Sequence, residues 1–130
     1  MPLSTTERRL AAESPDRVFG AFVADELAGI VGLGREQRAK NRHKANVFGM
    51  YVAPEHGRRG IAAALLRRVI ETAQMEGIAQ LVLTVTDTNV PAETLYERSG
   101  FRSFGVEPRA IRVDDVYYDK NHMIHFLSQP

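Results

Sequence analysis

Residues 46–86 read NVFGMYVAPEHGRRGIAAALLRRVIETAQMEGIAQLVLTVT and contain two strand-like runs with a helix-like run between them. The first run, Asn46–Val52, is largely apolar and is closed by Pro54, which cannot donate a hydrogen bond to a sheet. Apolar residues then recur at helical spacing up to Gly77, which is typical of a helix end. The second run, Gln80–Thr86, is apolar and β-branched, as expected for a strand covered on both faces. These lengths predict a parallel βαβ unit.

The residues on either side of this unit predict antiparallel pairs. Upstream, the apolar runs Val18–Ala24 and Ala28–Gly34 are separated by the polar step Asp25-Glu26 and indicate a hairpin. Downstream, Arg102–Val113 and Tyr117–Leu127 form a second predicted hairpin. The chain therefore combines antiparallel strand pairs with a central parallel unit.

Two further helices are expected. Thr5–Glu13 suits a short helix that stops at the Pro15-Asp16 pair. Val90–Ser99 suits another, with Pro91 tolerated in its first turn and Gly100 at its end. Together these elements predict an α/β fold of the α+β type, in which a mixed, mostly antiparallel sheet has helices on both faces.

The composition predicts a single globular domain over residues 1–130, because 44% apolar and 25% charged residues exclude the signature of disorder. The absence of cysteine excludes disulfides, thiolate metal sites and a cysteine nucleophile. A net charge of +1 does not point to nucleic acid. The longest apolar stretch, Leu27–Gly34, is far shorter than the ~18 residues that span a bilayer. The charged start MPLSTTERR lacks the apolar run of a secretory signal, so we expect a cytoplasmic protein without a membrane partner.

The loop Pro54–Ala62 lies between the end of a predicted strand and the start of a predicted helix. The first turn of a helix offers unpaired N–H groups and partial positive charge to an anion. Gly57 and Gly60 let the backbone approach a ligand closely, and Arg58 and Arg59 can add charge-assisted hydrogen bonds. A pyrophosphate is the ligand that suits this geometry, but for the loop taken alone a tight turn with solvated arginines is the favoured interpretation. It matches neither the Walker loop nor the dinucleotide fingerprint.

A second segment, Asn89–Phe101, reads NVPAETLYERSGF and has the spacing of an ordinary amphipathic helix. Taken together, the two segments resemble the GNAT superfamily of N-acetyltransferases. The loop is similar to the family's Gln/Arg-x-x-Gly-x-Gly/Ala motif, and the second segment matches Asn-x-x-Ala-x-x-Leu-Tyr-x-x-x-Gly-Phe at every position. The resemblance covers about Val18 to Leu127. In one departure, Gly57 occupies the Gln/Arg position and the arginine follows at Arg58.

The resemblance implies that acetyl-CoA binds with its pyrophosphate at the helix start and its pantetheine arm beside a splayed strand at Asn46–Val52. The amide of Val52 is then the expected donor to the thioester oxygen, on which negative charge develops. The cofactor contacts implied in this way are Met50, Tyr51, Val52, Gly57, Arg58, Arg59, Gly60, Ile61, Ala62, Ala63, Asn89, Ala92 and Tyr96. No metal is implied, because the odd spacing of His122 and His125 points them to opposite faces of a strand.

The same resemblance implies direct attack by an acceptor amine and proposes roles for three side chains. Tyr96 is the expected general acid for the departing thiolate, since a phenol pKa of ~10 keeps its proton at neutral pH. A core tyrosine is the competing interpretation. Glu36 and His43 flank the basic connection Arg35–Lys44 and are the candidates for accepting the amine's proton, with plain surface positions as the alternative. Asn89 suits a helix cap as well as a cofactor contact.

Three functions therefore stay open: an acetyl-CoA-dependent N-acetyltransferase, an acyl-CoA-binding module without catalysis, and a small nucleic-acid-associated protein. The last is disfavoured because the basic connection has no interleaved aromatic residues for base stacking. Relatives usually place a strand and two helices before the hairpin that starts at Val18. The shortened amino terminus can supply one short helix but not that strand, so we expect a second subunit to cover the open sheet edge.

Overall fold

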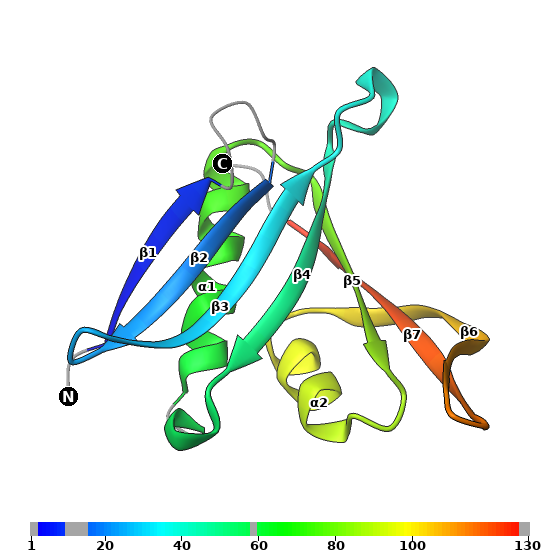
Figure 1. Cartoon of the computed structure of the whole chain (residues 1–130). Coiled ribbons are helices and arrows are strands. Elements are labelled where there is room, and N and C mark those ends of the chain that lie inside the picture. Colours follow the sequence, from blue (N-terminus) through cyan, green and yellow to red (C-terminus); the bar gives the residue numbers. More distant parts are fainter. Residues whose placement is uncertain (1–2, 10–15, 58–59, 128–130) are drawn as a thin grey trace.

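A computed structural model of the chain describes residues 3–9, 16–57 and 60–127, which form a seven-stranded sheet with two α-helices (Figure 1). In chain order the elements are β1 (Leu3–Arg9), β2 (Asp16–Val23), β3 (Glu26–Arg35), β4 (Lys44–Val52), α1 (Ile61–Met75), β5 (Gln80–Thr86), α2 (Val90–Arg98), β6 (Arg102–Val113) and β7 (Val116–Phe126), with short 3-10 turns at Ala39–Asn41 and Pro54–His56. The strand order is β1-β2-β3-β4-β5-β7-β6, and only β4 and β5 pair in parallel. The predicted mixed, mostly antiparallel sheet with a central parallel unit is confirmed.

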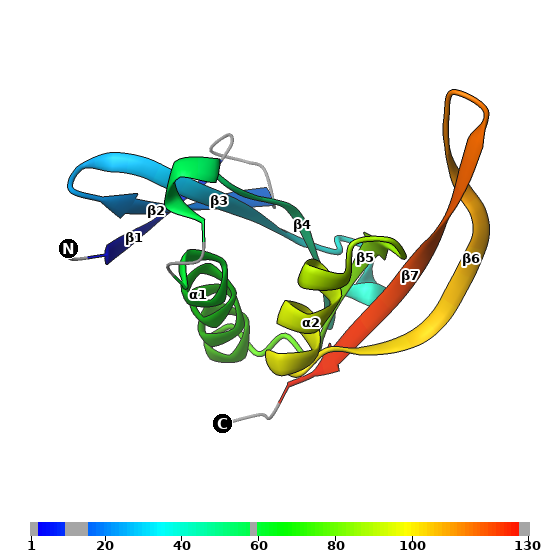
Figure 2. The same cartoon turned by 90° about the horizontal axis from the view of Figure 1, so that it is seen from below.

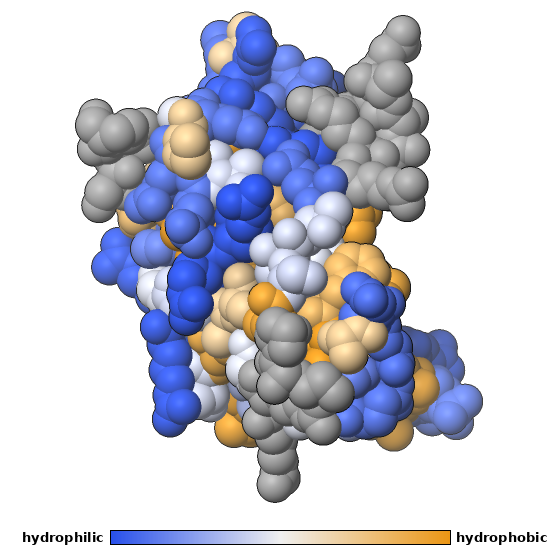
Figure 3. Space-filling view, turned by 90° about the vertical axis from the view of Figure 1, so that its left-hand side faces the viewer, coloured by the Kyte–Doolittle hydropathy of each residue, from blue (hydrophilic) through white to orange (hydrophobic). Residues whose placement is uncertain are grey.

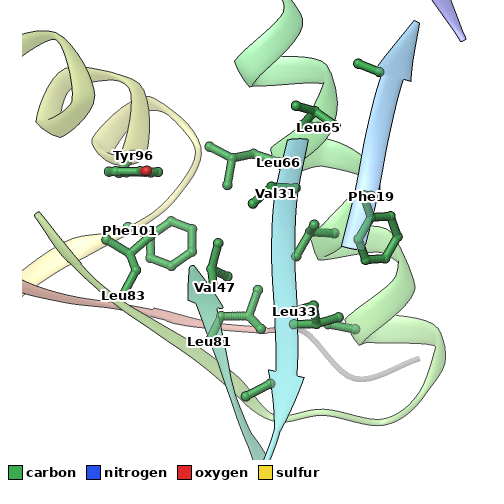
Figure 4. Close-up of a cluster of buried hydrophobic side chains, with 14 of the residues drawn as sticks. Phe19, Val31, Leu33, Val47, Leu65, Leu66, Leu81, Leu83, Tyr96 and Phe101 are labelled. Carbon is green, nitrogen blue, oxygen red and sulfur yellow. The ribbon is translucent and has the colours of Figure 1, made fainter. Parts of the chain in front are cut away.

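Both α-helices lie on the same face of the sheet, which corrects our expectation of helices on both faces (Figure 2). The apolar stripe of α1 packs on alternate residues of the strands, and Leu65 and Leu66 lie near Val31 of β3 in the core (Figure 4). On the opposite face, Phe48 covers Gly32, where a Cβ atom would come within 2.4 Å of the phenyl ring. On that face an aromatic ring, and not a helix, covers this position of β3.

This one-sided cover also corrects the prediction for β5. The strand has the predicted bounds, but its residues alternate between buried and more accessible positions instead of being covered on both faces. Leu81 and Leu83 are buried against the helices, whereas Thr84 is exposed on the other face. The chain folds no α-helix over Thr84 within the described residues, so that face of the strand is left accessible.

The amino-terminal residues form a strand, not the helix predicted at Thr5–Glu13. β1 pairs antiparallel with β2 along its whole length, from Leu3 opposite Val23 to Arg9 opposite Arg17. Residues 10–13 lie outside the described residues. Pairing with β2 overrides helical propensity here, as tertiary context often does. The expected open sheet edge beside β2 is therefore occupied by the chain itself, which removes the reason given for a second subunit at that edge.

A buried arginine helps to join β1 and β2 to the end of α1. Arg17 is only 4% exposed, and its guanidinium donates hydrogen bonds to Glu7 on β1 at 2.9 Å and to Glu76 beyond α1 at 2.7 Å. The hydrogen bond to Glu76 is the main reason why the pKa of Arg17 lies above its ordinary value. Two carboxylates thus offset the cost of burying a cation, which would be prohibitive without a partner.

The two predicted hairpins are confirmed. The turn between β2 and β3 consists of Ala24 and Asp25, one residue earlier than expected, and both have positive φ angles of 51° and 67°. Positive angles at both turn residues suit the right-handed twist of a two-residue hairpin. The β6–β7 pair turns at Asp114-Asp115 and extends from the body as a long twisted ribbon (Figure 2).

The side of the molecule at the β1 edge is mostly hydrophilic, with a smaller hydrophobic area (Figure 3). Ser4 and Thr6 are exposed on this strand. Polar residues on an edge strand reduce its tendency to pair with another chain. Separately, neither of the described helices has the length and apolar character needed to cross a membrane.

His125 gives the fold a predicted pH dependence. Its ring packs against Phe101 with the centroids 5.4 Å apart, and burial lowers its pKa below the ordinary value of 6.5. His125 therefore binds a proton more readily in the unfolded chain than in the folded one. The contribution of the neutral imidazole to the stability of the fold is complete above about pH 6.5, the ordinary histidine pKa. This contribution is lost as the pH falls through the lower pKa of the folded state.

We expect His125→Gln to flatten the dependence of the unfolding free energy on pH between 7 and 5, as measured by urea denaturation. The control is Ser4→Ala, at an exposed position without a charged side chain, which should keep the wild-type slope. An unchanged slope in His125→Gln would contradict this account.

Candidate active site

The two parallel strands at the centre of the sheet separate after a short paired segment. Pairing between β4 and β5 begins at Lys44 opposite Gln80 and ends at Asn46 opposite Val82. Both strands continue beyond that point without pairing to each other, and they diverge (Figure 1). The two strands therefore splay apart, as the family resemblance implied, and we call the interval between them beyond Asn46 and Val82 the slot.

The wall of this slot contains a β-bulge that the sequence analysis missed. Phe48 pairs with Gly32 and Tyr51 pairs with Ile30, so β4 has one extra residue in this interval. Gly49 takes the left-handed conformation there, with φ of 63°. A glycine inside a strand pattern is a recognised signal of a bulge and could have revealed it.

Beyond the bulge, the backbone of β4 presents an amide to the slot. The Ala53 N–H donates to the Ala28 carbonyl of β3 at 2.8 Å, and Val52 lies opposite Gly29 in the same pair of strands. Because successive N–H groups of a strand point to opposite sides, the Val52 amide points away from β3 and toward the slot. This orientation agrees with the donor role predicted for Val52. Met50 and Val52 pack partly against the core, whereas Tyr51 is exposed.

The start of α1 forms an open cradle of backbone amides. Gly60 is the N-cap residue with φ of 73°, and no described side chain caps it. The first helical hydrogen bond runs from the Ala64 N–H to the Gly60 carbonyl at 3.0 Å, so the amides of Ile61, Ala62 and Ala63 have no partner within the helix. A Cβ atom at Gly60 would meet nothing within 4 Å. An anion fits this position.

The remaining residues of the predicted loop differ in what they can contribute. The Gly57 N–H donates to the Pro54 carbonyl at 3.1 Å, so that amide is used inside the turn. Arg58 and Arg59 lie outside the described residues. The cradle therefore depends on the helix start and not on the Gly57 amide.

A groove of about 620 Å³ runs between α1 and α2 on the helical face of the sheet. It is lined by Ala63, Arg67, Ile70, Glu71, Pro91, Thr94, Leu95, Arg98 and Ser99. Ala63 thus belongs both to the amide cradle and to the groove, and Arg67 and Arg98 supply positive charge along it. The groove has room for an elongated anionic ligand whose phosphates lie at the cradle. Ala92, a predicted cofactor contact, does not line the groove and packs against the core.

Tyr96 lies between α2 and the sheet and is 8% exposed. Its ring meets Phe101 edge-on, with the centroids 6.0 Å apart and the planes at 66°, and lies near Leu83 of β5 (Figure 4). Burial raises the pKa of Tyr96 above its ordinary value of 10.0, so the phenol keeps its proton at neutral pH. At the start of the same helix, the Asn89 side chain accepts a hydrogen bond from the Ala92 N–H at 3.3 Å, which makes this residue a helix cap.

A second cavity, of about 850 Å³, opens on the face of the sheet opposite the helices. Its lining consists of Asp16, Gly34, Arg35, Glu36, Lys44, Asn46, Val47, Phe48, Gln80, Val82, Leu83, Thr84, Phe104, His122 and Ile124. Phe48 and Thr84 are among the first residues of β4 and β5 beyond the last paired position. This cavity and the groove between the helices therefore lie on opposite faces of the sheet, and the cavity adjoins the slot.

The two predicted proton acceptors differ in their relation to this cavity. Glu36 lines the cavity, and its carboxylate accepts a hydrogen bond from the side-chain amide of Asn46 at 3.1 Å. His43 is exposed and does not contribute to the lining, and its backbone carbonyl accepts from the Ala79 N–H at 2.8 Å. The structure thus brings Glu36, but not His43, to the cavity.

The histidines of β7 lie on opposite faces of the sheet, as their spacing predicted. His125 packs against Phe101 on the helical face, and His122 lines the cavity on the other face. Within the part of the chain that the structure describes, the one group of side chains with the spacing for a metal is Glu26, Glu55 and His56. Two of its members are exposed carboxylates, which commonly lie together without an ion, so we assign no metal to it.

Comparison with known proteins identifies the family. Residues 2–101 match the model of the acetyltransferase (GNAT) family. The chain belongs to this family. The GNAT chain is 33% identical over 94 residues to N-acetyltransferase 8B of Rattus norvegicus, a match that covers 69% of this chain and 42% of the rat protein. It spans less than half the length of the mammalian relatives that it matches.

Two bacterial proteins share more of the GNAT chain's length. An L-amino acid N-acetyltransferase of Escherichia coli (strain K12) is 28% identical over 118 residues, which cover 90% of this chain and 72% of that protein. The crystal structure of a GNAT-family acetyltransferase from Streptococcus pneumoniae superposes with a TM-score of 0.82 at 29% identity, over 90% of this chain and 70% of the other. The fold of the family therefore extends beyond the region that the family model matches.

Proposed function

We propose that this chain is an N-acetyltransferase that moves an acetyl group from acetyl-CoA to the amine of a small molecule, peptide or protein. The observation that carries the proposal is the separation of β4 and β5, with a cavity beside it on one face of the sheet. On the other face a groove between the helices shares Ala63 with the amide cradle, so a donor and an acceptor have separate faces of the sheet to bind. Family membership and relatives named as N-acetyltransferases support the same reaction.

Acetyl-CoA, when bound, supplies the acetyl group as a thioester. The amides of Ile61, Ala62 and Ala63 would hold its pyrophosphate at the start of α1. The Val52 amide, pointing into the slot, would donate a hydrogen bond to the carbonyl oxygen on which charge develops. Tyr96 would hold a proton for the departing sulfur. The amine attacks directly in this scheme, in agreement with a chain that has no cysteine nucleophile.

A second candidate is a module that binds acyl-CoA without catalysis. Gly57 favours it, because this glycine stands where the family motif has a side chain able to contact phosphate. The expected homodimer and cytoplasmic location stay predictions from the sequence.

Two measurements on the whole chain test the proposal. Isothermal titration with acetyl-CoA should give heat of binding, and thiol release should follow when spermidine, an L-amino acid or a lysine-containing peptide is added. Absence of binding heat would contradict both candidates. Binding without thiol release from any of these amines would favour the binding module.

A further inference from the structure

His122 is a histidine on β7 to which the sequence analysis assigned no function. It lies on β7 directly opposite Thr84 of β5 and lines the cavity on the face away from the helices. Thr84 is beyond Val82, the last β5 residue that pairs with β4. His122 is therefore next to the slot, and its side chain is 34% exposed and accessible to a ligand in the cavity.

Two neighbours on β6 hold the imidazole ring in place. The Nε2 atom of His122 lies 3.1 Å from a carboxylate oxygen of Glu107, and the Phe104 ring meets the imidazole edge-on with the centroids 6.0 Å apart. When Nε2–H donates to the carboxylate, the neutral ring has its lone pair on Nδ1, which can then accept a proton. The same division of roles between two ring nitrogens operates in the serine-protease triad.

A β-bulge brings the carboxylate to the correct face. Ser103 pairs with Met123, but the next pair is Gly105 with His122, so Phe104 is an extra residue in β6. Without this insertion Glu107 would lie opposite Asp119 and on the helical face, because a shift of one residue turns every side chain over. With it, Glu107 pairs with Lys120 and shares the face of His122. Bulges that redirect a side chain are common beside active sites.

We propose that His122, positioned by Glu107, accepts the proton of the acceptor amine; the inference rests on the proposed function. The N–H bond of the ammonium breaks, its electron pair stays on the amine nitrogen, and a new N–H bond forms at Nδ1. The neutral amine then attacks the acetyl carbon as the carbon–sulfur bond breaks, and the sulfur takes its proton from Tyr96. One of the two protons left on the nitrogen restores Tyr96, the other stays as the N–H of the amide product, and His122 releases its proton to water. An amine with a pKa of ~8 to ~10 needs such a group at neutral pH.

Position favours His122 over Glu36, the other candidate in the same cavity. The Glu36 N–H donates to the Lys44 carbonyl at 3.1 Å, which places Glu36 at the end where β4 and β5 are still paired. His122 lies opposite Thr84, beyond the last position at which β4 and β5 pair. The charged groups around the imidazole are Glu107 on β6 and Lys120 on β7. On β5 the neighbour of the imidazole is the uncharged Thr84. The charged residues that line the rest of the cavity are Asp16, Arg35, Glu36 and Lys44.

The test compares His122→Gln with Tyr117→Phe, a control at an exposed position on the same strand and outside the cavity lining. We expect His122→Gln to lower kcat/KM for the amine at pH 7 by roughly 100-fold, the lower end of the range for general-base catalysis. The deficit should shrink toward pH 10, where the amine loses its proton unaided. The dissociation constant of acetyl-CoA, measured by calorimetry, should stay within about twofold of wild type, and Glu107→Gln should cause a smaller loss with the same pH trend.

The failure of this inference and that of the proposed function give different results. Wild-type kcat/KM and an unchanged pH profile in His122→Gln, with wild-type protein active, would overturn the role of His122 alone. A loss that is equal at pH 7 and pH 10 would also overturn it, because it would indicate structural damage. A wild-type protein that binds no acetyl-CoA would overturn the proposed function and this inference with it.

Discussion

Replacing Tyr96 by phenylalanine should lower kcat about a hundredfold and leave the affinity for acetyl-CoA nearly unchanged. The hydroxyl is the only group removed, while the buried ring and its edge contact with Phe101 are retained. A positioned general acid contributes about 10²–10⁴-fold to rate, which sets the expected scale. Steady-state thiol release gives kcat, and isothermal titration gives the dissociation constant.

The matched control is Tyr117→Phe, which makes the same chemical change near the tip of the β6–β7 ribbon. Tyr117 is 46% exposed there and stacks with Arg109, whose guanidinium carbon lies 4.7 Å from the ring centroid. Its kcat should match that of wild type. If Tyr96→Phe turned over as fast as Tyr117→Phe, another group would have to protonate the leaving sulfur.

The second large effect is expected at the amide cradle. Gly60 and Gly77 stand at the two ends of α1, both have φ of 73°, and a Cβ atom at either position would meet nothing within 4 Å. Alanine at either site therefore introduces the same left-handed strain, about 1–2 kcal/mol. Only Gly60 adjoins the amides that we assign to pyrophosphate.

We expect Gly60→Ala to weaken acetyl-CoA binding roughly 10- to 100-fold, because disturbing one charge-assisted hydrogen bond costs about 1.5–3 kcal/mol. Gly77→Ala should lose similar stability in urea denaturation but bind acetyl-CoA like wild type. Equal affinity losses in the two variants would show that strain in α1, and not the cradle, controls binding. Unchanged affinity in Gly60→Ala would remove the helix start from the binding site.

Local sequence signals predicted much of the fold. The bounds of β5 match the prediction, and α1 lies where its apolar spacing and Gly77 placed it. These features depend on residues close together in the chain, so periodicity and turn residues suffice to find them. The loop that precedes α1 and the segment at Asn89–Phe101 likewise indicated the family through their residue types and spacing.

Other features depend on partners that are distant in the chain. Leu3–Arg9 forms a strand because β2 pairs with it and because Arg17 links Glu7 to Glu76, 59 residues away from the arginine. The sequence predicted a helix there because a local window contains neither partner. The bulge at Gly49 could have been inferred, but its effect on the Val52 amide required the register of β3.

Neighbouring residues encode the central helix, the strand that follows it and the residue types of the cofactor motif, so these features can be read locally. The common face of the two α-helices and the contact between His122 and Glu107 arise only when distant segments pack together. That contact depends on strand register, and a single extra residue at Phe104 changes which side chains share a face. Such a shift leaves the composition and periodicity of β6 almost unaltered, so it becomes visible only when the strands are paired.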